Sequence, residues 1–80
     1  MGIFDKLFRK KSFDELLDEY YKVGWDRALL KKGYENLFKR RLEILKQAAK
    51  RARNDKERLV VNAYMLELKR EAQAHGIETR

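Results

Sequence analysis

Residues 27–58 read RALLKKGYENLFKRRLEILKQAAKRARNDKER, and this stretch decides the fold. Apolar residues recur within it at intervals of three or four, which is the period of one helix face. The recurring residues are Leu30, Tyr34, Phe38, Leu42, Leu45, Ala49 and Ala52. Asn54-Asp55 then interrupts the pattern with two residue types typical of turns and helix N-caps. We therefore predict a helix over 27–53 that ends in a tight turn.

The residues after this turn predict a second long helix over 56–75, with Asp55 as its N-cap. Its inward face is predicted to comprise Val61, Tyr64, Met65, Leu68 and Ala72. Gly76 stands where helices commonly end in a left-handed residue, and Ile77 can fold back on the last turn. A turn this short joins antiparallel neighbours, so the two helices form a hairpin.

A shorter helix is predicted over 13–23, before the hairpin. Ser12 followed three residues later by Glu15 is the pattern of a capping box, which satisfies free amides at a helix start. Gly24 is predicted to end this helix in the left-handed conformation. The alternative is one long helix that runs through Gly24.

Asp26 is a suitable N-cap for the helix over 27–53, and Trp25 is expected to pack against Leu30 across it. Trp25 belongs to a group of aromatic residues that we interpret as core. Aromatic side chains beside bases also stack on nucleobases or lie at membrane interfaces, and this alternative stays open. The group comprises Tyr20, Tyr21, Trp25 and Tyr34.

The predicted fold is all-α: a long antiparallel helical hairpin with a short N-terminal helix packed alongside and an amphipathic terminal segment. Residues 1–11 are the basic amphipathic segment, and residues 12–80 form one small helical bundle. The chain of 80 residues has no Cys, which excludes disulfides, thiolate zinc sites and a cysteine nucleophile. It also has no apolar run near the roughly 20 residues that span a bilayer.

Charge is strongly segregated along the chain, whose net charge is +7. Residues 27–58 carry twelve bases against four acids, whereas residues 12–26 carry five acids against one base. The basic block favours an anionic partner, unless the acidic block folds back on it. Its candidate anion-binding residues are Lys39, Arg40, Arg41, Lys46, Lys50, Arg51, Arg53, Lys56 and Arg58.

The N-terminal segment combines bulky apolar residues on one helix face with adjacent bases, as a helix at a membrane surface requires. We expect it to dock on a membrane or a partner, or else to cap the bundle core. The residues concerned are Ile3, Phe4, Leu7, Phe8, Arg9, Lys10 and Lys11.

Two family resemblances accompany these features. Met1-Gly2-Ile3-Phe4, together with the basic run over 45–58, resembles phage-shock protein A and the ESCRT-type membrane-remodelling proteins. That resemblance implies a hairpin at a membrane surface. Arg70 and His75 match the Arg-x4-His spacing of the HEPN ribonucleases, which are small, helical and dimeric, although Glu71 departs from the residue types usual after the Arg. That resemblance implies RNA cleavage by a dimer.

The residues favour a non-enzymatic interaction module without catalytic residues, metal or cofactor, because one His and scattered carboxylates do not make a site. We expect it to bind a nucleic acid or a nucleoprotein assembly through backbone electrostatics. The alternatives are a peripheral membrane hairpin, a protein adaptor or inhibitor, and a HEPN-like ribonuclease. We also expect a homo-oligomer. The seam of apolar residues over 30–52 is longer than the one helix predicted to cover it. The expected location is cytoplasmic, at a membrane or in a nucleoprotein particle.

Overall fold

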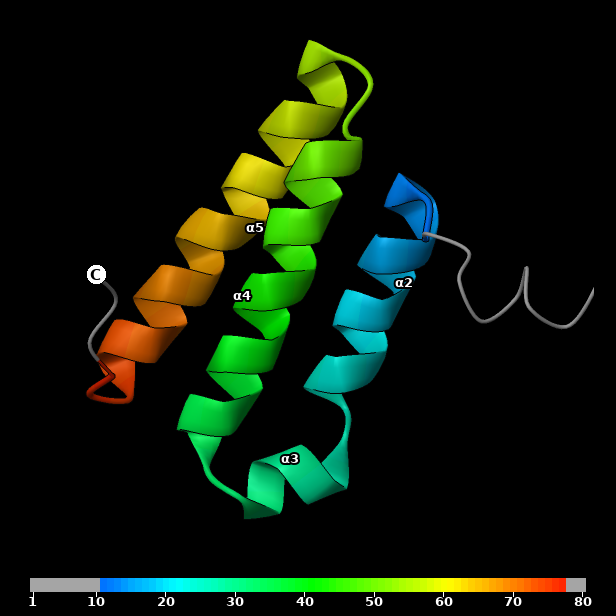
Figure 1. Ribbon diagram of the computed structural model, residues 1–80. Coiled ribbons are helices and arrows are strands. Elements are labelled where there is room, and N and C mark those ends of the chain that lie inside the picture. Colours follow the sequence, from blue (N-terminus) through cyan, green and yellow to red (C-terminus); the bar gives the residue numbers. More distant parts are fainter. Residues whose placement is uncertain (1–10, 78–80) are drawn as a thin grey trace, which may run out of the picture.

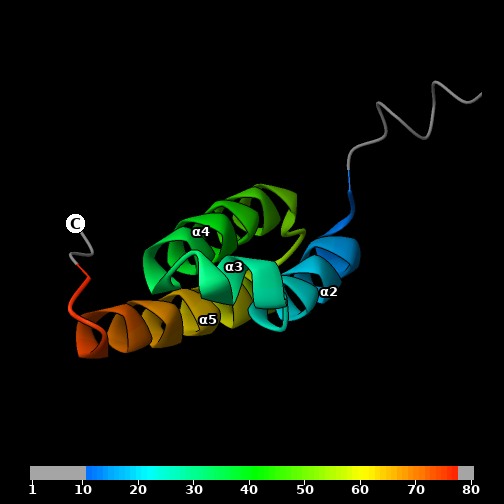
Figure 2. The ribbon, with the colours of Figure 1, turned by 90° about the horizontal axis from the view of Figure 1, so that it is seen from below.

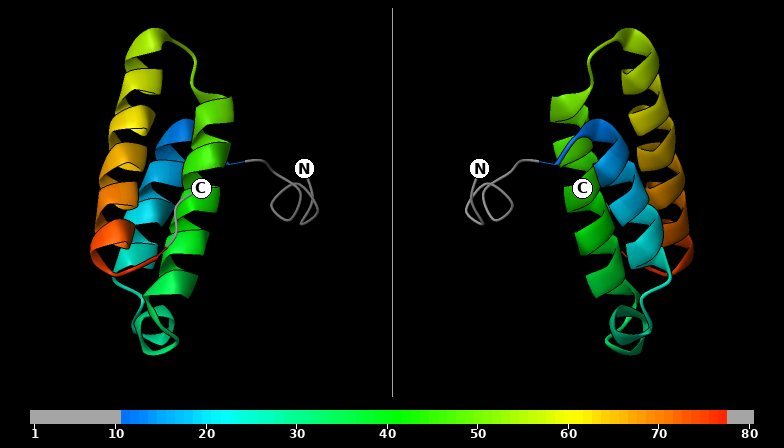
Figure 3. Two further views of the ribbon diagram at one scale, coloured as in Figure 1. Left: turned by 90° about the vertical axis from the view of Figure 1, so that its left-hand side faces the viewer. Right: turned by 90° about the vertical axis from the view of Figure 1, so that its right-hand side faces the viewer.

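The computed structural model describes residues 11–77, which form helices without any strand (Figure 1). The helices are α2 (Phe13–Gly24), α3 (Arg27–Lys31), α4 (Tyr34–Arg51) and α5 (Asp55–Ala74). α4 and α5 form the predicted antiparallel hairpin, and α2 packs alongside it. Both views of Figure 3 show α2 on one side of the hairpin, between α4 and α5. The all-α prediction is therefore confirmed.

α4 is the central helix, because it packs against α2, α3 and α5 (Figure 2). A helix with neighbours on two sides buries a wider stripe than a single seam. Its buried residues are Leu37, Phe38, Ile44, Leu45 and Ala48. The predicted seam contained only Phe38 and Leu45 of these, and it wrongly included Leu30 and Ala49, which are exposed. The predicted helical period was correct. The predicted seam was too narrow because we expected one helix to pack against it, whereas α4 packs against more than one.

The predicted continuous helix over 27–53 is wrong, because the chain breaks between α3 and α4. Lys32 ends α3, and Gly33 precedes α4 with φ of 104° and ψ of 152°. A side chain strains this backbone conformation, so glycine is the residue that allows it. The break lets α3 cross the lower end of the molecule in Figure 1 instead of prolonging α4.

α2 begins as predicted, with Ser12 as its N-cap. The Ser12 hydroxyl accepts a hydrogen bond from the Glu15 amide at 3.3 Å. α2 ends at Gly24, but this glycine is not in the predicted left-handed conformation. A Cβ at Gly24 would lie 2.8 Å from Nη2 of Arg41, so the missing side chain admits the Arg41 guanidinium instead.

Asp26 caps α3 as predicted, since its carboxylate accepts a hydrogen bond from the Ala28 amide at 2.9 Å. The expected packing of Trp25 against Leu30 is not a core contact, because these side chains are 84% and 51% exposed. α3 has a single turn, and it places Leu29 rather than Leu30 against the core.

The tyrosines of the aromatic group divide between core and surface. Tyr20 is buried and Tyr34 is partly buried, whereas Tyr21 is half exposed. The rings of Tyr20 and Tyr21 both contact the Tyr64 ring of α5, with centroids 5.5 and 6.0 Å away. This tyrosine contact joins α2 to α5, which otherwise meet chiefly through α4.

α5 differs from the prediction at its first turn and agrees with it elsewhere. Its N-cap is Asn54, whose side-chain oxygen accepts from the Glu57 amide at 2.9 Å, and Asp55 is the first helical residue. Asn54 takes the role because it comes three residues before that amide. The predicted inward residues are buried or partly buried: Val61, Tyr64, Met65, Leu68 and Ala72.

The end of α5 follows the prediction for a glycine stop. Gly76 has φ of 77°, and the Ile77 amide donates to the Ala72 carbonyl at 2.9 Å. With the Gly76 amide bonded to the Gln73 carbonyl at 3.0 Å, this is the Schellman motif. Ile77 is partly buried against the core, so it folds back on the helix.

Candidate anion-binding surface

The nine candidate anion-binding residues separate into paired and unpaired bases. Ion pairs engage Lys39, Arg40, Arg41, Arg53 and Arg58. Within residues 11–77, no ion pair engages Lys46, Lys50, Arg51 or Lys56, and all four are exposed. The sequence alone does not show which of these nine bases form ion pairs, and the fold leaves fewer than half of them unpaired.

Three of the unpaired bases lie on the last turns of α4, and we call Lys46, Lys50 and Arg51 the α4 basic cluster. Lys46 and Lys50 are four residues apart, so they share a helix side. They lie opposite the face that buries Leu45 and Ala48. The cluster adjoins the α4–α5 turn, at the upper end of the molecule in Figure 1.

The α4–α5 turn itself carries bases that are already paired. Arg53 contacts Glu57 through its backbone amide at 2.8 Å and its guanidinium at 3.1 Å. These hydrogen bonds lower the pKa of Glu57 and raise that of Arg53. Arg58 lies 3.7 Å from Asp55. Residues 46–58 nevertheless hold six bases against two acids, so the local field stays positive.

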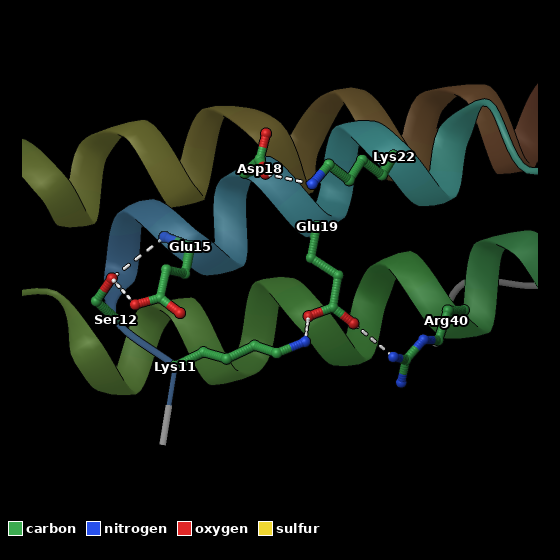
Figure 4. A network of polar contacts seen from close by, with 7 residues as sticks. All are labelled: Lys11, Ser12, Glu15, Asp18, Glu19, Lys22 and Arg40. Atoms are coloured by element: carbon green, nitrogen blue, oxygen red, sulfur yellow. Dashed lines mark hydrogen bonds and ion pairs between the residues drawn. The ribbon is translucent and has the colours of Figure 1, made fainter. Parts of the chain in front are cut away.

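The acidic block of α2 does fold back on α4, and Figure 4 shows the contact. Glu19 accepts from Arg40 at 2.6 Å and pairs with Lys11 through its other carboxylate oxygen. Nearby, Lys22 pairs with Asp18 at 2.9 Å. The Glu19 side chain is only 18% exposed, so Arg40 serves the α2–α4 contact in this structure, and Lys11 shares the same carboxylate.

Arg41 is held among α2, α4 and α5. Its guanidinium lies over the Tyr20 ring, 4.0 Å from the centroid, and 4.0 Å from the Glu71 carboxylate. The Tyr34 hydroxyl donates to the same carboxylate at 2.9 Å. Burial, with the hydrogen bond to Glu71, raises the pKa of Tyr34 to about 12. Arg41 is therefore an internal link between helices, with a side chain only 16% exposed.

Sequence reasoning did not single out a second basic surface, at the α3 end. Arg27, Lys31 and Lys32 are exposed there, and no ion pair engages them within residues 11–77. Trp25 and Leu30 are exposed beside them. The excess of bases there could be read from the sequence. Because Trp25 and Leu30 were expected to lie in the core, the α3 end was not predicted to be an exposed site.

The remaining candidates are placed only in part. Lys11 pairs with Glu19, whereas Ile3, Phe4, Leu7, Phe8, Arg9 and Lys10 lie outside the described residues.

His75 caps the end of α5 and stacks on Tyr34, with ring centroids 4.0 Å apart. Arg70 is an exposed residue of the same helix. No group of three potential metal ligands occurs among residues 11–77, and none of the helices described is long and apolar enough to cross a membrane.

Comparisons of the chain with protein-family models, with curated proteins and with solved structures gave no match. We therefore infer the function from the residues of this chain.

Proposed function

We propose that this protein binds a nucleic acid or a nucleoprotein assembly through phosphate contacts made by the α4 basic cluster. The observation that carries the proposal is the contrast between Lys46, Lys50 and Arg51, which are exposed and unpaired within residues 11–77, and Arg40 and Arg41, which pair internally. Bases that are unpaired in the free protein can neutralise phosphates without first breaking an internal ion pair.

The geometry of the cluster suits a polymer backbone. Lys46 and Lys50 are one helical turn apart, about 6 Å along the axis. Phosphates of one strand advance roughly 3.4 Å along a duplex axis, so the two ammonium groups can reach different phosphates. The guanidinium of Arg51 is planar and can donate two hydrogen bonds to one phosphate. Contacts of this kind position a protein on a nucleic acid without reading its sequence, so we expect weak sequence preference.

The test is binding to duplex DNA and to RNA across a salt series. Replacing Lys46, Lys50 and Arg51 by Gln removes the α4 basic cluster. Each contact contributes about 0.9 to the slope of log affinity against log salt on duplex DNA, so the slope should become shallower by roughly 3. The matched control replaces Arg27, Lys31 and Lys32, which removes the same charge at the α3 end.

The expected result is a control variant whose salt slope stays close to that of the unmodified protein. Absence of binding to both DNA and RNA at low salt would refute the proposal. Equal losses in both triple variants would also refute it, because they would indicate a response to net charge rather than to the cluster. Circular dichroism of each variant checks that the helices remain intact.

A second candidate function is peripheral contact with an anionic membrane through the α3 end. It is supported by the exposure of Trp25 and Leu30 beside Arg27, Lys31 and Lys32. Trp favours the interface between headgroups and acyl chains, and bases attract anionic lipids.

The chain has one Trp, so its fluorescence reports this surface directly. Vesicles of an anionic phospholipid should shift Trp25 emission to the blue and protect it from an aqueous quencher. Vesicles of a zwitterionic phospholipid are the control, and they should cause little change. Unchanged emission at low salt with anionic vesicles would remove this candidate.

A further inference from the structure

The outer face of α5 carries apolar side chains that nothing covers within the described chain. Leu59 is 68% exposed, Leu66 is 53% exposed and Val60 is 37% exposed. Leu59 and Leu66 are seven residues apart, so they lie on one side of the helix, with Ala63 between them. The opposite side buries residues such as Val61 and Leu68. α5 is therefore apolar on two faces, of which only one has a neighbour among residues 11–77.

Charged residues flank this outer stripe in an ordered way. Lys56 and Glu67 lie along one edge of the stripe, and Asp55 and Lys69 lie along the other, as the 3.6-residue period requires. Among residues 11–77, no ion pair engages Lys56, Glu67 or Lys69. Asp55 lies 3.7 Å from Arg58, and its side chain is 96% exposed. Each edge thus has a base at one end and an acid at the other.

We propose that a second copy of this chain packs antiparallel on the outer face of α5. The two-fold axis passes between Asn62 and Ala63. Leu59 then lies opposite the partner's Leu66, and the same contact repeats across the axis. Lys56 comes within two residues of facing the partner's Glu67. On the other edge, Asp55 comes within one residue of facing the partner's Lys69.

Charge complementarity favours a second copy of this chain as the partner. An antiparallel pair brings opposite charges together on both edges, twice each, because the contact is symmetric. In a parallel pair the two edges would exchange, so that Lys56 would face the partner's Asp55 and Glu67 the partner's Lys69. The antiparallel direction is favoured because it places the positive end of each helix dipole beside the negative end of the partner's. This dimer does not require the proposed anion binding, because the α4 basic cluster lies on another helix.

The size of the stripe sets the expected affinity. One helix pair buries less than the ~1,600 Å² of a standard interface. We therefore expect a dimer that forms in the micromolar range and dissociates on dilution. The sequence predicted self-association from the seam over 30–52, but α4 has neighbours on both sides in the fold. On α5, in contrast, the outer apolar residues remain uncovered within the described chain.

The first test measures mass against concentration by sedimentation equilibrium. The unmodified chain should approach twice its 9.7 kDa mass at high micromolar concentration. Replacing Leu59 and Leu66 together by Gln should leave a monomer at every concentration. The matched control is Leu30→Gln, which changes another half-exposed leucine and should keep the dimer. A persistent monomer of the unmodified chain, or a dimer indifferent to the Leu59 and Leu66 changes, would overturn the proposal.

The second test examines the direction of packing. Lys56→Glu places like charges opposite each other twice in the symmetric dimer, so it should weaken dimerisation by roughly tenfold. Adding Glu67→Lys in the same chain restores opposite charges across the axis and should recover the affinity. A double variant that dimerises no better than Lys56→Glu alone would show that the antiparallel pairing is wrong.

Discussion

Leu45 and Leu30 belong to the same predicted seam, yet the structure assigns them very different surroundings. Leu45 is completely buried on α4, whereas Leu30 is 51% exposed on α3. If one continuous helix carried both residues on one seam, truncating either to Ala would cost similar stability. The structure instead predicts a large loss for Leu45→Ala and a small loss for Leu30→Ala.

The difference follows from what each truncation removes. Leu→Ala deletes three carbons, each worth about 0.8 kcal/mol when fully buried. At Leu45 the neighbours can close the gap only partly, so a cavity term adds to the loss, and the total should be about 2–5 kcal/mol. At Leu30 roughly half of the transfer energy is at stake and water fills the space, so we expect about 1 kcal/mol or less.

Thermal unfolding followed by circular dichroism separates the two outcomes. For a domain of this size, 1 kcal/mol lowers Tm by about 4–8 °C. Leu45→Ala should therefore lower Tm by more than about 8 °C, and Leu30→Ala by less than that. The measurement belongs at low micromolar concentration, so that self-association contributes little. Equal shifts, or a larger shift for Leu30→Ala, would refute the break between α3 and α4 and the exposed position of Leu30.

Two further predictions concern the turns on either side of α4. Gly33→Ala should cost about 1–3 kcal/mol in urea unfolding, because φ of 104° strains any side chain, and a neutral result would contradict this conformation. Glu57 is stabilised as a carboxylate by Arg53, which lowers its pKa from 4.5. Its contribution to stability is therefore complete above its unfolded pKa and is lost as the pH falls through the lower folded value. Unfolding at a series of pH values should show Glu57→Gln less stable than the unmodified protein near neutral pH. The difference should disappear in acid, and a difference independent of pH would contradict the ion pair.

The features that could be predicted from the sequence are those decided within a few residues. The caps at Ser12 and Asp26 and the stop at Gly76 depend on local hydrogen bonds and on glycine's freedom at positive φ. The inward face of α5 was predictable because α5 packs mainly against one helix. Its residues therefore follow a single stripe.

The features that could not be predicted depend on residues far apart in the chain. The buried stripe of α4 widened because α2 folds back on it, which no periodicity within α4 reveals. Gly33 lies inside the helix predicted over 27–53, but helices tolerate single glycines, so the break required the structure. Gly24 admits a guanidinium from α4, and the identity of that residue, Arg41, follows only from the packing.

The ion pairs of the candidate site also divide into those that the sequence predicts and those that only the fold shows. Pairs such as Lys39 with Glu35 and Arg53 with Glu57 are four residues apart, so they can be predicted from their spacing alone. The pair between Arg40 and Glu19 spans 21 residues and appears only when α2 lies on α4. Charge alone therefore overestimates an anion-binding surface, because it counts bases that the fold uses internally.

The two proposed surfaces lie on different helices, and their arrangement has a functional consequence. In the antiparallel dimer, the two Lys56 residues would be about 20 Å apart along the axis, on opposite sides of the two-fold axis. The α4–α5 turns, with the adjoining α4 basic clusters, would then lie toward opposite ends of the dimer. A polyanion long enough to reach both clusters would be bound twice, and the second contact would be intramolecular. Weak self-association and weak phosphate binding would thus reinforce each other on a polymer, while a free phosphate or a short oligonucleotide would engage one cluster and gain nothing from the dimer.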